Sequence, residues 1–197
     1  MRYITTLFLL FVFVISLSAQ KDIPVTAGKN FGKLKIGMTE KQVRAILGND
    51  LQVKTYKEEM TAFWYHNRTI RMDSITQFVL GFDKCLELSD SLNKYWPVFK
   101  IYLLNDRVNC FIVTSYNDDS LLVKKVLVDK KIRFNTEQEK CVMYFGNEYI
   151  NTPYPGYDEY IYYKKGIQLL FKEGVFKTFK IFTPEPNFLK LIAARSS

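Results

Sequence analysis

The residue types that most often carry catalysis are sparse in this chain. His66 is the only histidine, and it follows the strand-like run Phe63-Trp64-Tyr65. A nucleophilic triad would have to use His66, yet no nucleophile-elbow sequence is present. Asp118-Asp119 is typical of a solvated turn, and no spacing pairs the other carboxylates considered: Asp83, Glu87, Asp90 and Glu159. We therefore expect a protein that is not an enzyme, with no catalytic residue and no cofactor.

The three cysteines are too far apart in sequence to indicate a zinc site. Cys110 alternates with Val108 and Ile112, and Cys141 occupies an apolar position of a predicted helix. Both are interpreted as small core residues. In an exported chain a bridge between Cys85 and Cys110 is an alternative that the sequence leaves open. No metal site is expected.

Tyrosine is the residue type that most suggests binding. Residues 154–163 contain five tyrosines, and in a strand Tyr160 and Tyr162 point one way while Ile161 and Tyr163 point the other. An exposed tyrosine offers a rigid contact area with a polar end, which suits protein recognition. The alternative is that the tyrosines fill a core and its rim. The predicted partner-binding residues are Tyr160, Tyr162, Tyr157, Trp64 and Tyr102.

The amino terminus has the pattern of a signal peptide. Arg2 precedes an apolar run over residues 7–15, and small residues end the segment at Ala19. No cysteine stands at the junction to carry a lipid. We expect residues 1–19 to be removed and the mature chain to be soluble in the periplasm or outside the cell.

The net charge of +8 is carried by scattered residues and not by one dense tract. This charge favours acidic partners or peripheral contact with an anionic membrane surface, although solubility is the simplest explanation. No nucleic-acid-binding motif is present, so nucleic acid is not an expected partner. Three lysine pairs contribute to the charge: Lys124-Lys125, Lys130-Lys131 and Lys164-Lys165.

A helix signature occurs twice. Residues 34–50 and 132–148 each contain Thr-Glu-x-(Gln/Glu), an apolar stretch and Gly-Asn-(Asp/Glu). The first helix should bury a face formed by Val43, Ile46 and Leu47. In both copies the threonine and the residue three positions later have capping-box spacing, namely Thr39 with Gln42 and Thr136 with Glu139.

Strand patterns follow each helix, including Ile167 to Lys172, Val175 to Phe182 and two strands joined by a turn near Asn105-Asp106. Gln168, Lys172, Thr178 and Lys180 are predicted to lie on a largely wet face of the sheet, and residues 83–97 are interpreted as a loop or short helix. The fold class predicted is α+β, with two similar units that each pack a short capped helix on an antiparallel β-sheet. The predicted segments are a signal peptide at 1–19, a first unit at 31–116, a second unit at 121–184 and a C-terminal tail at 185–197.

The segment from Leu34 to Asn49 resembles the opening of the BamE-type outer-membrane assembly lipoproteins and of the wider β-lactamase-inhibitor-protein-like superfamily. The matching positions are Gly37, Met38, Thr39, Val43, Ile46, Leu47 and Gly48. The resemblance implies a helix that leads into a small antiparallel sheet. This chain lacks the lipid-bearing cysteine of the BamE type, and its second copy lacks the Gly-Met step. The matched positions are caps and core, so no functional residue is carried over.

These observations lead to a functional hypothesis. We expect an exported, non-enzymatic protein-interaction module that binds another envelope or secreted protein through open sheet faces. Envelope assembly and inhibition of a secreted enzyme are the nearest analogies. The alternative is a small-ligand or lipid-headgroup binding protein, which would have a deep pocket lined by aromatic residues.

Overall fold

The computed structural model describes residues 22–49, 51–55, 82–90, 93–115, 121–154, 156–187 and 189–190. The predicted signal peptide, Trp64, His66 and Asp118-Asp119 lie outside these residues. So do the junction between the two predicted units and most of the predicted tail, and the predicted segment boundaries stay predictions.

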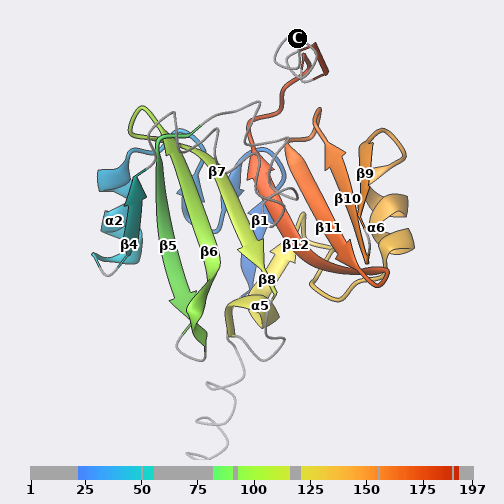
Figure 1. The fold of residues 1–197 in the computed structure, drawn as a ribbon, viewed down its shortest axis with the longest axis horizontal. Coiled ribbons are helices and arrows are strands. Elements are labelled where there is room, and N and C mark those ends of the chain that lie inside the picture. Colours follow the sequence, from blue (N-terminus) through green and yellow to red (C-terminus); the bar gives the residue numbers. More distant parts are fainter. Residues whose placement is uncertain are drawn as a thin grey trace, which may run out of the picture.

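The centre of the protein is an eight-stranded antiparallel sheet (Figure 1). Two consecutive runs of strands meet in it, because β7 pairs on one side with its sequence neighbour β6 and on the other with β12, which lies far from it in sequence. From one edge to the other, the order is β4 (Gln52–Thr55), β5 (Lys84–Asp90), β6 (Asn93–Leu104), β7 (Arg107–Thr114), β12 (Val175–Phe182), β11 (Ile167–Lys172), β10 (Tyr157–Tyr162) and β9 (Ile150–Tyr154).

A smaller four-stranded sheet lies behind the large one in Figure 1, with the order β3 (Leu34–Lys35), β2 (Asn30–Phe31), β1 (Ile23–Thr26) and β8 (Val126–Val128). Strands β1 and β8 pair in parallel, although about 100 residues separate them in sequence. The helices α2 (Glu40–Leu47) and α6 (Gln138–Phe145) lie beside β4 and β9 at the two ends of the large sheet, and α5 (Leu121–Lys125) leads into β8.

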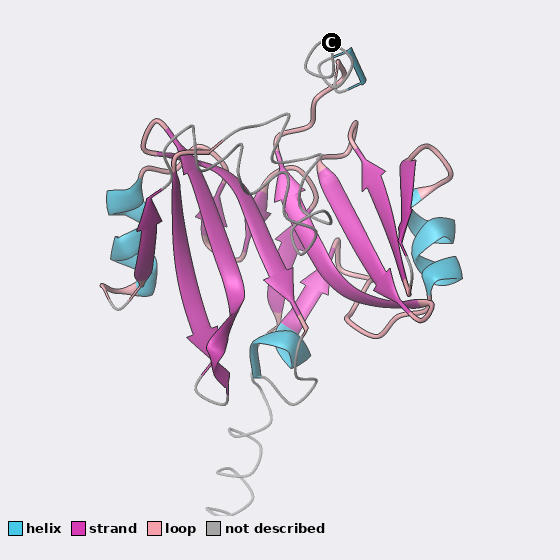
Figure 2. Ribbon diagram, viewed as in Figure 1, coloured by secondary structure: helices cyan, strands magenta, loops and turns pink. Residues whose placement is uncertain are grey.

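The predicted fold class is wrong. Strands dominate the described structure (Figure 2), and the strands of the two predicted units form one continuous sheet. In the predicted fold, two separate units would each pack a helix on their own sheet, and each sheet would end in a free edge where the units meet. Here the pairing of Cys110–Thr114 with Thr178–Phe182 removes that edge. The protein is therefore mainly β, with two sheets and short helices at the ends.

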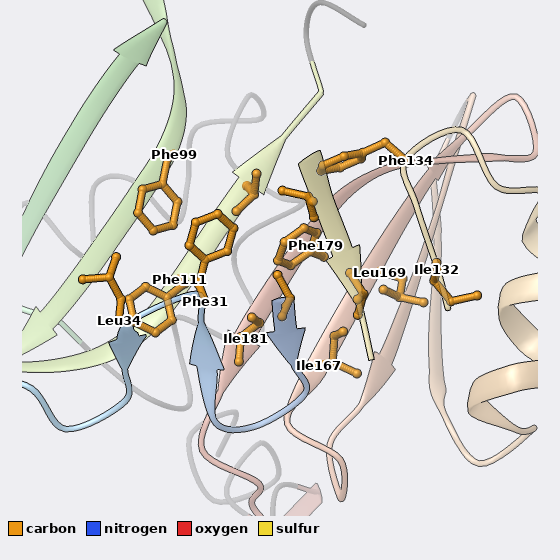
Figure 3. Close-up of a cluster of buried hydrophobic side chains, with 14 of the residues drawn as sticks. Phe31, Leu34, Phe99, Phe111, Ile132, Phe134, Ile167, Leu169, Phe179 and Ile181 are labelled. Carbon is orange, nitrogen blue, oxygen red and sulfur yellow. The ribbon is translucent and has the colours of Figure 1, made fainter. Parts of the chain in front are cut away.

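One apolar core fills the space between the two sheets (Figure 3). Phe31 of the small sheet stacks on Phe99 of the large sheet with ring centroids 4.6 Å apart, and Phe99 lies 6.0 Å from Phe111. On the β12 side, Phe134 stacks on Phe176 at 5.1 Å. This burial of large rings is the main favourable term that holds the sheets together.

Both predicted helices form, but only the first has the predicted capping box. The Thr39 side chain accepts from the Gln42 backbone N–H, and the Gln42 side chain accepts from the Thr39 N–H. The second helix begins one residue later, after Glu137, which makes no side-chain cap. Of the predicted face of α2, Val43 is buried whereas Ile46 is exposed. No helix in the described ranges is long and apolar enough to span a membrane.

The segment interpreted as a loop or short helix contains β5 and the start of β6. The interpretation is wrong. In β5 the apolar Leu86 stands between polar or small residues, and few residues of this strand have high strand propensity, so the sequence does not indicate a strand here. The predicted hairpin turn at Asn105-Asp106 is confirmed, since both residues have the positive φ angles of a tight turn.

Substitution of two glycines that have positive φ angles, Gly166 and Gly174, tests how tightly their turns pack against the rest of the protein. A Cβ on Gly166 would collide with the Phe182 carbonyl oxygen, whereas a Cβ on Gly174 would meet nothing within 4 Å. We expect Gly174→Ala to cost about 1 kcal/mol of unfolding free energy from backbone strain alone. Gly166→Ala should cost about 3 kcal/mol because the backbone must also shift. Urea denaturation measures both, and equal losses would contradict the packing.

The two threonines before the helices provide a second comparison. Thr39→Ala removes a cap that is present, so we expect a loss of about 1 kcal/mol in unfolding free energy. The Thr136 hydroxyl accepts from the Arg133 N–H and caps no helix, so Thr136→Ala should cost clearly less. Chemical denaturation of both variants checks this, and a larger loss for Thr136→Ala would overturn the assignment of the caps.

Candidate functional site: the second face of the large sheet

The large sheet has two faces of different chemistry. Its first face packs on the small sheet and the two end helices, and supplies the apolar core. Its second face is the opposite one. Residues paired directly across neighbouring strands point to the same face, so the register identifies a central row on the second face. This central row consists of Glu87, Lys100, Ile112, Lys180, Gln168 and Ile161.

Charged side chains of the central row are deeply placed. Lys180 is 2% exposed, and Glu87 and Gln168 are also buried. Glu87 Oε1 lies 3.9 Å from Lys100 Nζ, and the Lys100 side chain is 27% exposed. Gln168 Nε2 donates to Oε1 of the buried Glu159, which is also on the second face. The central row therefore carries one carboxylate and two lysines, and Glu159 adds a second carboxylate on the same face.

The rows on either side of the central row differ from each other. Toward one end of the strands the second face is apolar, with a cluster of Cys85, Tyr102, Cys110, Ile112, Ile161 and Phe182. Phe82 meets the Tyr102 ring edge-on at 4.8 Å between centroids. Toward the other end, the half-buried Thr114 and Thr178 pair across β7 and β12. Along the direction of the strands, the side chains of the second face thus change from aromatic and apolar, through charged, to hydroxyl-bearing.

The predicted tyrosine surface does not form as one patch. Tyr160 and Tyr162 belong to the core on the first face, and Tyr162 is only 1% exposed. Tyr102 lies on the second face but is buried, and the half-buried Tyr157 shares that face according to its register. Trp64 lies outside the described residues. The structure therefore places Tyr102 and Tyr157 on one face of the sheet and Tyr160 and Tyr162 on the other.

The core tyrosines form a packed group beneath α6. Tyr149 stacks on Tyr160 with centroids 4.2 Å apart, and Tyr160 also contacts Gln138 of the helix. Burial raises the pKa of Tyr160 and of Tyr162 above the usual range for a phenol. The Tyr162 hydroxyl has no hydrogen-bond partner in the structure. These tyrosines pack the helix against the sheet, which is the alternative that the sequence left open.

The cysteines are core residues, as the sequence indicates for Cys110 and Cys141. All three are buried, and burial raises the pKa of the Cys141 thiol to about 12. Cys85 and Cys110 both face Tyr102, from β5 and β7, so β6 lies between them. Two strand spacings amount to about 9.5 Å, which is beyond the reach of a disulfide. The alternative of a Cys85–Cys110 bridge is thus ruled out by geometry.

A shallow hollow of about 560 Å³ lies against α2. Glu40 binds both Arg44 and Lys84, at 2.7 Å and 2.6 Å, and the hydrogen bond from Lys84 is the main cause of its lowered pKa. The hollow lacks the aromatic lining expected of a small-ligand pocket. It is lined by Glu40, Lys41, Arg44, Ala45, Asn49 and Asp106.

Sequence reasoning missed the central row as a site. It placed Gln168 and Lys180 on a largely wet face, whereas both are buried. Their alternation with apolar neighbours was visible, but their burial was not. In the part of the chain that the structure describes, no group of three or more His, Cys, Asp or Glu side chains could hold a metal ion. Comparisons with protein-family models, curated proteins and solved structures gave no match.

Thiol labelling tests the placement of the cysteines. We expect all three thiols to react in denaturant without prior reduction, because the strand order keeps Cys85 and Cys110 apart. In the native protein the reaction should be slower by at least on the order of 100-fold, since burial prevents access to the reagent. Fewer than three reactive thiols in unreduced, denatured protein would show a disulfide and contradict the register.

Proposed function

We propose that this protein is an exported, non-enzymatic protein-interaction module and that the second face of its large sheet is the recognition surface. The observation that carries the proposal is the central row of charged side chains. These residues lie at the middle of a sheet whose other face already supplies the core. A charged row here is not required for the hydrophobic stabilisation of the fold.

The energetics of buried charge support this proposal. Removing a lysine or a carboxylate from water costs several kcal/mol, and pairing does little more than offset that cost. Apolar residues of similar size would serve stability equally well or better. Charged groups that are buried at such a cost in stability occur most often at functional sites.

The accessible parts of the second face suit a protein partner. Lys100, Thr114 and Thr178 are half-buried and lie at or beside the central row, and Tyr157 and Tyr163 are half-buried nearer β9. A partner would meet cationic, hydroxyl and phenol groups on rigid strands. This mixture gives charge complementarity for specificity and aromatic area for affinity.

A double replacement tests the proposal. Glu87→Gln/Lys100→Met removes both charges of one ion pair of the second face. We expect its unfolding free energy to stay within about 1 kcal/mol of the parent protein. Capture of a protein from an envelope extract, followed by affinity measurement with the identified partner, should show at least about a tenfold loss.

The exposed pair Glu137 and Lys140 at the start of α6 is the matched control, since it forms a 2.8 Å ion pair away from the second face. Glu137→Gln/Lys140→Met makes the same chemical change and should keep the partner. Equal capture by both double variants would contradict the proposal. A large loss of stability in the first variant alone would instead assign the central row to folding.

A further inference from the structure

Two of the three lysine pairs come together at one rim of the molecule. The β1–β2 turn carries Lys29, the turn after β8 carries Lys130-Lys131, and the β10–β11 turn carries Lys164-Lys165. These turns are separated by at least 30 residues in sequence. Their lysines, here called the lysine rim, are all exposed.

Backbone contacts hold the three turns together. The Gly28 N–H donates to the Gly166 carbonyl oxygen at 3.1 Å, and a Cβ on Gly28 would lie 2.7 Å from the Lys165 oxygen. On the other side, the Asp129 N–H donates to Val25 at 2.7 Å, and the Ala27 N–H donates to the Asp129 carboxylate at 3.1 Å. The β1–β2 turn therefore lies between the other two.

Most of the positive charge of the lysine rim is not neutralised. Among the described residues, Lys164 pairs with Glu148, whereas Lys29, Lys130 and Lys165 form no ion pair. Two further carboxylates are near: that of Asp129 accepts from Ala27, and that of Glu185 accepts from Asn187. The rim keeps a net positive charge, because it has five exposed lysines against these three carboxylates.

Tyrosines accompany the outer lysines. Lys131 Nζ lies 5.1 Å from the ring centroid of Tyr144, and Lys164 Nζ lies 5.9 Å from that of Tyr163. Lysine and tyrosine side by side are typical of the headgroup layer of a membrane, where an ammonium meets phosphate and a phenol ring lies between water and acyl chains.

We propose that the lysine rim binds the phosphate groups of an anionic lipid surface, so that the protein adsorbs to a membrane through this rim. The interaction is peripheral and electrostatic, because the turns present charge and phenol rings and no long apolar segment. Binding through the rim goes beyond the proposed recognition of a protein, since its cations lie on turns and not on the second face of the sheet.

Vesicle sedimentation of the full chain tests this inference, with phosphatidylcholine vesicles and with vesicles that also contain phosphatidylglycerol. The rim variant is Lys29→Gln/Lys130→Gln/Lys165→Gln. The control variant is Lys41→Gln/Lys140→Gln/Lys172→Gln, which changes net charge equally at exposed lysines elsewhere. All three proteins have the same amino terminus, so the apolar run at residues 7–15 cannot explain a difference between them.

We expect the parent protein to prefer the anionic vesicles and to be released by salt. The rim variant should lose binding by on the order of 100-fold, since each lysine near an anionic surface contributes about fivefold. The control should lose much less. Equal losses would show a net-charge effect only and overturn the inference. So would the absence of a preference for anionic vesicles, or rim-dependent binding to polyglutamate without vesicle binding.

Discussion

Strands β7 and β12 pair along five residues each, from Cys110–Thr114 to Thr178–Phe182, and the two runs of strands become one sheet through this pairing. Apolar residues of both strands then face the same side, with Phe111 next to Ile181 and Val113 next to Phe179. The small sheet can cover both halves because the surface beneath it has no gap. Without this pairing, each half would expose an edge with unsatisfied backbone groups.

The same pairing creates the second face. Ile112 and Lys180 meet at its centre, and charged or polar residues of β5, β6, β10 and β11 extend the arrangement to either side. The first face supplies the larger apolar core, whereas the second holds charged groups beside a smaller apolar cluster. This division of roles between two faces of one sheet is the physical basis for treating the charged face as the recognition surface.

The turns depend on the sheets as well. The close approach of Gly28 and Gly166 requires positive φ angles and the absence of a Cβ, and it fixes the β1–β2 turn against the β10–β11 turn. The parallel pairing of β1 with β8 then brings the Asp129–Lys131 turn to the same place. Lysines from three distant parts of the sequence thereby share one rim. The lysine pair before β8 lies at the opposite end of that short strand.

The sequence by itself determined the local structure. Helical spacing located α2 and α6, alternation located β11 and β12 to the residue, and Asn105-Asp106 marked a hairpin turn. These features depend on neighbours within a few residues, which a sequence displays directly. The alternation even separated Gln168 and Lys180 from the apolar residues of their strands.

Only the tertiary structure decided what depends on distant contacts. The local sequence does not distinguish a strand at the edge of a sheet from a strand that pairs with another run of strands. The pairing of β7 with β12, and with it the mainly β fold, could therefore not be predicted from the sequence. The burial of a residue likewise depends on which other parts of the chain cover it. For that reason Tyr160 and Tyr162 are core residues, Lys180 is buried, and two of the three lysine pairs belong to a common rim.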